Sequence, residues 1–157
     1  MSKRVLDLFG VFVLLPIVII PYLIISILIK LTSKGPVLHW SDRIGQNNII
    51  YKMPKFRTMY IGTPDVATHL LKDPAQFITP LGKVLRKTSL DELPQLWSVI
   101  NSSMSFVGPR PALHNQFDLK ELRTKEGVHL LKPGIIGWAQ VNGRDEISIE
   151  QKVVLDS

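Results

Sequence analysis

Two adjacent carboxylates, Asp91 and Glu92, lie in the segment SLDELPQ (residues 89–95) of a chain that is rich in lysine and arginine. Such a pair can hold a hard divalent cation, or one carboxylate can attack an electrophile while the other assists. The alternative is purely structural, because acidic residues at the start of a helix are stabilised by the helix dipole. Helix starts far outnumber catalytic carboxylate pairs, so the rest of the sequence has to decide between these two interpretations.

Two later motifs place arginine in a stiff backbone. MSFVGPRPAL (104–113) puts Arg110 between two prolines, which restrict the backbone and lower the entropy cost of fixing the side chain on a phosphate. LKPGIIGWAQVNGR (131–144) contains three glycines and ends in Arg144. Each motif also has a structural interpretation, the first as a rigid connector and the second as a buried strand with Trp138 in the core. Together with the acidic pair, the motifs favour a site that binds phosphate groups.

Length and charge narrow the class of partner. The chain has 157 residues, 19 Lys and Arg against 13 Asp and Glu, a net charge of +6 and a pI near 9.7. One compact domain, with or without an appendage, fits this length. The charge indicates an anionic partner, and nucleic acid fits least well, since the basic residues are dispersed and no nucleic-acid motif occurs. The lack of cysteine excludes disulfides, thiolate metal sites and cysteine nucleophiles.

Residues 8–29 form a run of 22 uncharged residues that is long enough to cross a bilayer as a helix. Pro16 and Pro21 interrupt this run and predict a kink or break near its middle. Basic residues flank both ends, so the charge distribution does not select a side of the membrane. A re-entrant helix and an ordinary kinked span both fit these observations. Asp7 is expected to pair with Lys3 or Arg4 at the membrane interface.

The remaining apolar runs are short and are separated by glycine and proline. Their composition and spacing predict strands at 37–40 and 48–53 and helices at 68–73 and 81–87. A further helix is predicted to start with Asp91 as its N-cap, which puts Pro94 in the first turn, where proline is tolerated. A capping box that starts at Ser89 is the alternative, but it places Pro94 inside the helix. An apolar stripe of this helix is expected to face the core: Leu93, Leu96, Trp97 and Ile100.

Five motifs follow one another along the chain. They are KR-x-x-D before the membrane segment, YKMPKFRTM (51–59), LRKTSLDELPQLW (85–97), MSFVGPRP (104–111) and KPGIIGWAQVNGR (132–144). In this order and density the sequence resembles the bacterial sugar transferases, and among them the small monotopic phosphoglycosyl transferases. The resemblance implies an α+β fold with a re-entrant, proline-broken membrane helix (1–31). A small, mainly helical cytoplasmic domain with short strands (32–157) would follow it.

The resemblance also implies an activity, which is the first membrane step of cell-surface polysaccharide or glycoconjugate synthesis. A sugar 1-phosphate would pass from a UDP-sugar to a membrane polyprenol phosphate (undecaprenyl phosphate), with Mg²⁺ as cofactor. Asp91 would attack the sugar-linked phosphate, release UMP and carry the phosphosugar, while Glu92 would help to hold Mg²⁺ or handle a proton. The implied location is the cytoplasmic face of the bacterial inner membrane. Membrane lipid and downstream glycosyltransferases are the further partners that it implies.

Attack by a carboxylate on a diphosphate brings two anions together, so fixed cations must neutralise the charge. Within the shared motifs, the residues expected to bind substrate phosphates are Lys55, Arg86 and Arg110, with Arg144 as a weaker candidate. Two further cations in these motifs, Arg57 and Lys87, are interpreted as surface charge.

The sequence departs from the family pattern in several places, one of which is the helix break, where Ile20 precedes Pro21 instead of the usual serine. Ser102 and Ser103 replace the usual Gly-Asp pair, and Asp145 follows Arg144 where asparagine is common. The chain also ends at KVVLDS, where family members continue into further helices, which indicates a C-terminally truncated domain. The alternative function is therefore that of an inactive truncated homologue that binds only membrane lipid or polyprenol phosphate. No residue identifies the sugar.

Overall fold

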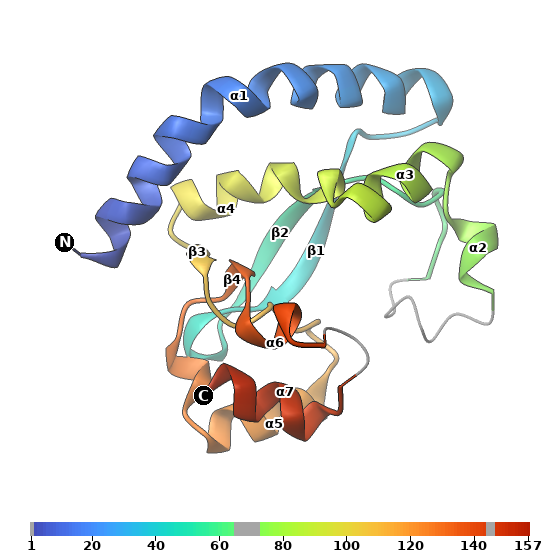
Figure 1. Cartoon of the computed structure of the whole chain (residues 1–157). Coiled ribbons are helices and arrows are strands. Elements are labelled where there is room, and N and C mark those ends of the chain that lie inside the picture. The colour runs from blue at the N-terminus through green and yellow to red at the C-terminus, as the bar shows by residue number, and fades with distance from the viewer. Residues whose placement is uncertain (1, 65–72, 144–146) are drawn as a thin grey trace. The chain divides into compact units, whose positions relative to one another are not determined.

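The structure is a computed structural model of the chain and describes residues 2–64, 73–143 and 147–157 (Figure 1). Its helices are α1 (Lys3–Thr32), α2 (Pro74–Phe77), α3 (Pro80–Thr88), α4 (Leu96–Ile100), α5 (Phe117–Lys125), α6 (Trp138–Val141) and α7 (Ile149–Asp156). The strands are β1 (Leu38–Ile44), β2 (Ile50–Phe56), β3 (Ser105–Val107) and β4 (Gly134–Ile136), and short 3-10 helices are η1 (Gln46–Asn48), η3 (Leu90–Gln95) and η4 (Val128–Leu130). This mixture of helix and strand confirms the α+β class.

The chain forms two compact units. Unit 1 comprises Met1–Val11, Ser41–Met53 and Leu96–Ser157, and unit 2 comprises Phe12–Trp40 and Pro54–Gln95. Two strands, β1 and β2, pair with each other and run through both units, as does α1. These strands and α3 confirm the predictions for 37–40, 48–53 and 81–87. The predicted division at residues 31 and 32 stays a prediction.

The core of unit 2 forms where α1 meets β2 and α3. Ile25 and Ile29 of α1 are buried with Phe56 of β2 and Leu85 of α3. Tyr22 extends the same face of α1, and its ring centroid lies 4.9 Å from that of Phe56. Residues spaced by three or four positions share one helix face, so this packing uses a single stripe of α1. The helix that precedes the carboxylate pair is thereby held against α1.

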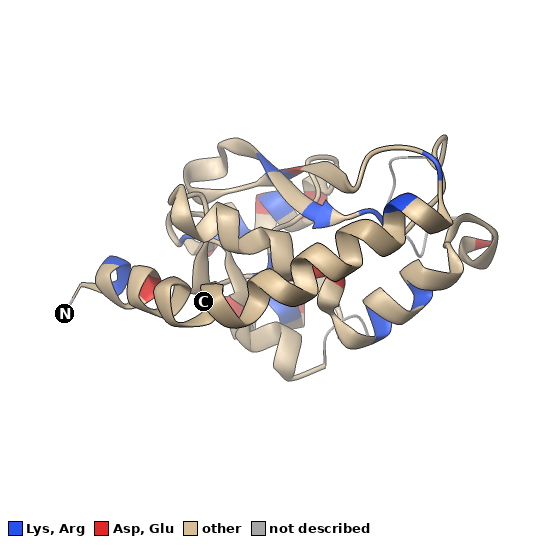
Figure 2. Ribbon diagram, turned by 90° about the horizontal axis from the view of Figure 1, so that it is seen from above, with Lys and Arg blue, Asp and Glu red and all other residues tan. Residues whose placement is uncertain are grey.

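The remaining surface of α1 is apolar and exposed. By length and composition α1 could cross a membrane, and most of its side chains are not covered by protein. Figure 2 shows the helix without charged residues between its two ends. Pro16 and Pro21 lie inside α1, which is continuous from Lys3 to Thr32, so the predicted break is not confirmed. The re-entrant path stays a prediction.

Arg57 anchors the end of α1 instead of adding surface charge, so that interpretation is wrong. Its side chain is buried, with 7% of its surface exposed. Arg57 Nη2 donates to the carbonyl of Ser33 at 3.0 Å and to its hydroxyl at 2.8 Å, and Nη1 donates to the carbonyl of Lys34. Carbonyls at a helix C-terminus lack partners within the helix and carry partial negative charge. Arg57 therefore caps the end of α1, whereas Lys87 is exposed as expected.

Unit 1 contains a parallel pair of short strands, β3 and β4, in which Ser105 pairs with Gly134 and Val107 with Ile136. The apolar cluster of this unit joins α5, η4 and α7 through Leu119, Val128 and Val153, together with Ala112. A buried ion pair also ties α5 to α7, since Arg123 Nη2 lies 2.6 Å from Asp156 Oδ2.

The first turns of α1 belong to unit 1 and are bound to it by polar side chains. Asp7 Oδ1 accepts hydrogen bonds from Ser105 Oγ at 2.9 Å and from the Phe106 amide at 3.1 Å. Arg4 donates to the last carbonyls of α4, and Lys3 donates to a carbonyl of β3. The prediction that Asp7 pairs with Lys3 or Arg4 is therefore wrong. The KR-x-x-D motif instead attaches α1 to α4 and β3.

Two tryptophans are exposed: Trp97, which was expected in the core, and Trp138, for which the core was the alternative interpretation. Trp97 of α4 has 55% of its surface exposed and Trp138 of α6 has 64%. The apolar stripe therefore buries Leu96 but not Trp97 or Ile100. The expected strand through IIGWAQV ends at Ile136, and a short helix begins at Trp138. Most of the helix predicted at 68–73 lies outside the described residues.

Candidate active site

The carboxylate pair lies in unit 2, immediately after α3. Ser89 ends α3 in the left-handed conformation (φ 58°, ψ 15°), and η3 begins at the next residue. The Glu92 amide donates to the carbonyl of Ser89 at 3.1 Å, so the first turn closes around Asp91. Asp91 is thus the second residue of a 3-10 helix that contains Pro94, and its prediction as an N-cap is wrong by two residues. The reversal at Ser89 turns the chain sharply between α3 and the pair.

Asp91 is buried, with 8% of its surface exposed. Burial raises the pKa of its carboxyl above the usual value of 3.8, because the charged form loses hydration. The positive charges of Lys55 and Arg86 oppose this increase in pKa, while the negative charge of Glu92 adds to it. A buried carboxylate among cations is poorly hydrated, which favours nucleophilic attack on a substrate that those cations bind.

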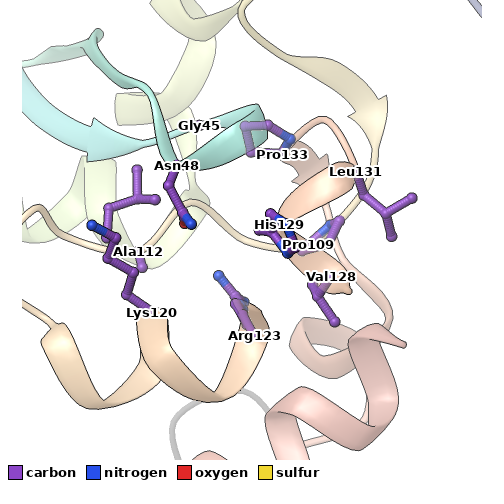
Figure 3. Close-up of a pocket in the computed structure, with 11 residues that line it drawn as sticks. Gly45, Asn48, Pro109, Ala112, Lys120, Arg123, Val128, His129, Leu131 and Pro133 are labelled. Atoms are coloured by element: carbon purple, nitrogen blue, oxygen red, sulfur yellow. The ribbon is translucent and has the colours of Figure 1, made fainter. Parts of the chain in front are cut away.

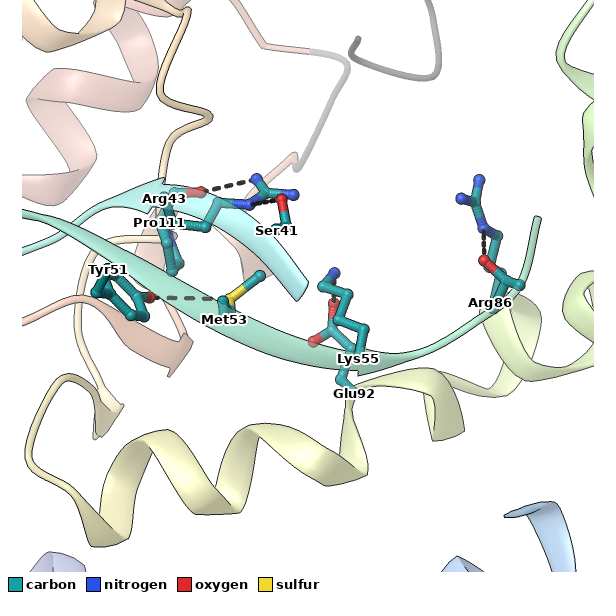
Figure 4. Close-up of polar contacts among 9 residues, drawn as sticks. Ser41, Arg43, Tyr51, Met53, Lys55, Arg86, Glu92 and Pro111 are labelled. Carbon is teal, nitrogen blue, oxygen red and sulfur yellow. Dashed lines mark hydrogen bonds and ion pairs between the residues drawn. The ribbon is translucent and has the colours of Figure 1, made fainter. Parts of the chain in front are cut away.

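Glu92 is held in an ion pair with Lys55 (Figure 4). Lys55 Nζ lies 3.0 Å from Glu92 Oε1, and the two side chains are 17% and 12% exposed. Lys55 reaches Glu92 from β2, where Lys55 is the residue after the buried Pro54. The pair fixes the direction of the Glu92 carboxylate beside Asp91. The predicted contact of Lys55 with substrate phosphates stays a prediction.

The side chain of Arg86 is held by the hydroxyl of Thr58. Its Nε donates to Thr58 Oγ1 at 2.9 Å, and Thr58 is itself buried (Figure 4). Burial lowers the pKa of the Arg86 guanidinium, and the negative charge of Asp91 opposes this decrease. Four predicted site residues therefore form one electrostatically coupled cluster in unit 2: Lys55, Arg86, Asp91 and Glu92.

Arg110 lies in unit 1, in a loop that the backbone holds at several points. The Gly108 amide donates to the carbonyl of Ile136 at 3.0 Å, and the Gly134 amide donates to the carbonyl of Pro109 at 2.9 Å. The Arg110 carbonyl accepts from Arg123 Nη1 at 2.8 Å. The motifs MSFVGPRP and KPGIIGWAQ thus form one structure around Arg110. Arg144 lies outside the described residues.

A small cavity lies under this loop in unit 1 (Figure 3). Its volume is about 30 Å³, and Pro109, Arg123, His129 and Pro133 are among the residues that line it. That volume suits one or two water molecules and is too small for a sugar nucleotide. Arg123 Nε and His129 Nδ1 are buried there without a protein partner, which fits a hydrated interior. We therefore assign the cavity no role in binding substrate.

The residues fit Mg²⁺ only when a phosphate substrate completes its coordination. Among the described residues there is no group of three or more His, Cys, Asp or Glu side chains that could hold a metal ion. Asp91 and Glu92 remain, and one oxygen of Glu92 is bound by Lys55. Mg²⁺ commonly takes one or two carboxylates and completes its shell with substrate phosphates and water. The carboxylate pair satisfies this requirement without a third protein ligand.

The profile of one family, bacterial sugar transferase, matches residues 1–157. The chain belongs to the bacterial sugar transferase family. Among its relatives in this family, the UDP-N-acetylgalactosamine-undecaprenyl-phosphate N-acetylgalactosaminephosphotransferase of Aeromonas hydrophila is 37% identical over 142 residues, which cover 88% of this chain and 33% of that protein. The undecaprenyl-phosphate glucose phosphotransferase of Komagataeibacter xylinus is 37% identical over 170 residues, covering 99% of this chain and 31% of that protein. The uncharacterized sugar transferase EpsL of Bacillus subtilis (strain 168) is 39% identical over 156 residues, covering 98% and 75%.

The chain spans about a third of the length of the first two of these transferases and three quarters of EpsL. The sugars in their names differ, N-acetylgalactosamine in one and glucose in the other. Two relatives that are each 37% identical to this chain are therefore named for different sugars. The regions matched in all three extend across the position of the carboxylate pair, since the matches cover 88% or more of this chain.

Sequence reasoning did not identify two residues that orient the predicted cations. Thr58 binds Arg86 from the KFRTM motif, and Gln140 lies beside Arg110 from the GWAQV motif. A single threonine or glutamine carries no chemical signal of its own. Their place inside the motifs was the one signal that could have pointed to them.

Proposed function

We propose that this protein transfers a sugar 1-phosphate from a UDP-sugar to a membrane polyprenol phosphate, with Asp91 as the covalent nucleophile. The observation that supports this most is the burial of Asp91 beside Lys55, Arg86 and Glu92. Membership of the bacterial sugar transferase family supports the same reaction. Relatives named as UDP-sugar and undecaprenyl-phosphate transferases support the two substrates.

The proposed reaction has two displacements at one phosphorus atom. An Asp91 carboxylate oxygen attacks the phosphorus that carries the sugar, and the bond from this phosphorus to the UMP oxygen breaks. UMP leaves, and the phosphosugar remains on Asp91 as an acyl phosphate. An oxygen of the polyprenol phosphate then attacks the same phosphorus, and the bond to Asp91 breaks. The products are UMP and a polyprenol diphosphate sugar, and the carboxylate is regenerated.

In this proposal Lys55 orients Glu92, and Arg86 places positive charge beside the nucleophile. Mg²⁺, held by Asp91, Glu92 and the substrate phosphates, would supply further positive charge to the diphosphate. Lys55 directs the Glu92 carboxylate, because the two groups are only 3.0 Å apart. Arg86 in turn is fixed by Thr58, so its charge need not reorganise during the reaction.

The long apolar helix supports a place at a membrane, where a polyprenol phosphate is held. We propose a monotopic arrangement, in which α1 enters and leaves on the cytoplasmic face of the inner membrane. The chain has no cysteine, so a single cysteine at Ser2 or Lys34 gives a unique label. Both labels should react with an impermeant maleimide from the cytoplasmic side. Reaction from opposite sides would show that α1 spans the membrane.

Mass spectrometry of the intact protein tests the reaction directly. Detergent-solubilised protein is incubated with Mg²⁺ and a panel of UDP-sugars, without polyprenol phosphate. The expected result is a mass gain of one phosphosugar on a peptide that contains Asp91, and its loss in Asp91→Asn. Asp73→Asn serves as the matched control, because Asp73 is an exposed aspartate of the same unit. If no donor gives an adduct while the protein still binds liposomes, a lipid-binding role replaces the transferase.

A further inference from the structure

Gln140 of α6 contacts the guanidinium of Arg110. With its side-chain amide oriented so that both ends are matched, Gln140 Oε1 accepts from Arg110 Nη1 at 2.9 Å. In the same orientation, Gln140 Nε2 donates to the carbonyl of Ile135 at 3.2 Å. Gln140 is therefore fixed at one end by the backbone of β4 and at the other by Arg110. Both side chains are partly buried.

The backbone around Arg110 is fixed as well, so the contact with Gln140 adds the final constraint on the side chain. The flanking prolines restrict the backbone of Arg110, and Arg123 holds its carbonyl. Gly137, the residue before α6, lies so close that a Cβ there would be 2.9 Å from the Gly108 carbonyl oxygen and 3.2 Å from the Arg110 amide nitrogen. This close approach brings the start of α6, and with it Gln140, next to Arg110.

An arginine side chain loses rotamer freedom when it binds a phosphate, and this entropy loss weakens binding. A guanidinium carries five N–H donors, so a bond to one glutamine oxygen leaves donors with which it can form a bidentate contact to phosphate. A glutamine is suited to this task because its oxygen is neutral. A carboxylate in its place would also hold the arginine but would partly neutralise its charge.

We propose that Gln140 is a positioning residue, which holds the Arg110 guanidinium ready to bind a substrate phosphate. This inference rests on the proposed function, since it takes Arg110 to be a phosphate ligand. Its consequence is specific: loss of Gln140 weakens phosphate binding through Arg110 and has no effect when Arg110 is already absent.

A double-mutant cycle on the full chain tests this. The variants are Gln140→Met, which keeps the length but removes the acceptor, Arg110→Met, and the combination of both. Affinity for UDP is measured by titration, because UDP contains the diphosphate of every UDP-sugar. KM and kcat follow from UMP release with UDP-N-acetylgalactosamine and UDP-glucose. Gln140→Met should weaken UDP binding and raise KM about tenfold, with kcat within about twofold, as expected for a lost charge-assisted hydrogen bond.

In the Arg110→Met background, Gln140→Met should change affinity by less than about twofold, because the group that it positions is missing. Gln140→Glu should keep more of the affinity than Gln140→Met but less than wild type, since it keeps an oxygen acceptor and partly neutralises the charge of Arg110. Gln46→Met is the matched control in the same unit, because Gln46 donates to the carbonyl of Leu130 instead. It should leave KM unchanged.

Equal losses from Gln140→Met in both backgrounds would overturn the positioning role, even if the enzyme is active. A wild-type chain that neither binds UDP nor releases UMP would overturn the proposed function together with this inference. Thermal unfolding of every variant distinguishes a failure to fold from a loss of binding. If Gln140→Met proves unstable, Gln140→Ala, which also removes the acceptor, carries the test in both backgrounds.

Discussion

Lys55 and Glu92 form an ion pair of 3.0 Å that is largely shielded from water, with side chains 17% and 12% exposed. Lys52, also on β2, pairs with Asp42 at the same 3.0 Å, but those side chains are 66% and 39% exposed. The chain therefore contains two ion pairs of equal length that differ chiefly in burial. Burial decides how much a partner matters, because an unpaired charge in a dry environment is costly.

Lys55→Met should lower the free energy of unfolding by about 3 kcal/mol, because it removes the positive charge that pairs with the largely buried Glu92 carboxylate. Lys52→Met should cost less than about 1 kcal/mol, since Asp42 remains hydrated. Denaturant titration of the detergent-solubilised protein measures both. The combination Lys55→Met with Glu92→Met should recover part of the loss. Equal costs at Lys55 and Lys52 would show that the buried pair is accessible to water.

The raised pKa of Asp91 predicts how Asp91→Asn changes stability with pH. The unfolded carboxyl titrates near 3.8 and the folded one above it, so the folded state binds the proton more tightly. Its favourable contribution is complete below pH 3.8 and is lost as pH rises through the folded pKa. Asp91→Asn should therefore stabilise the protein relative to wild type at pH 7, and the advantage should shrink as pH falls toward 4.

The measurement is the free energy of unfolding of wild type and Asp91→Asn from pH 3.5 to 7.5. EDTA is present, so that the pKa belongs to the metal-free site. Wild-type activity should also fall on the acidic side, since only the ionised carboxylate can attack phosphorus. A difference between the two proteins that does not vary with pH would mean that Asp91 has an ordinary pKa.

Asp7→Ala should destabilise the protein by about 2 kcal/mol. The change leaves the Ser105 hydroxyl and the Phe106 amide without their acceptor, and Ser105 is fully buried. Asp7→Asn should cost less, because one oxygen acceptor remains. Glu121→Ala, at an exposed position of the same unit, is the control. Thermal unfolding in detergent measures all three, and a neutral Asp7→Ala would show that α1 is not attached to β3 through this carboxylate.

Gly134→Ala should be among the most damaging small substitutions in unit 1. A Cβ at Gly134 would collide with backbone atoms of Gly108, which cannot move aside without breaking the loop that holds Arg110. We expect a loss of at least about 2 kcal/mol. Gly127→Ala separates this from backbone strain, because Gly127 has φ of +76° but no atom within 4 Å of a Cβ. That control should cost about 1 kcal/mol, and comparable losses would remove the steric explanation.

Local patterns predicted those parts of the fold that depend on local physics. The strands around 37–40 and 48–53 and the helix at 81–87 follow from side-chain type and periodicity, and the structure contains them. The start of η3 was missed by two residues. Ser89 adopts the left-handed conformation at the end of α3. Serine has no preference for this conformation, so the sequence does not predict it.

Predictions failed where a distant partner decides the outcome. Asp7 lies close to Lys3 and Arg4 in the sequence, yet it binds Ser105 and Phe106. Arg57 likewise binds Ser33, which is far from it along the chain. Trp97 and Trp138 are apolar enough for a core, but their helices turn them outward. Of the candidate site, residue types identified the carboxylates and the cations. They could not reveal that Lys55 forms an ion pair with Glu92.

The cap that Arg57 places on α1 bears on how the protein responds to bilayer thickness. A helix that is free at its end can slide or tilt until its apolar length matches the lipid. Here the guanidinium binds the carbonyls of Ser33 and Lys34 and is itself buried, so sliding of α1 would break these bonds. In the proposed membrane arrangement, the helix would therefore present a fixed set of residues to the acyl chains. Lipids of different chain length would have to deform around it, which would tie the stability of unit 2 to the composition of its host membrane.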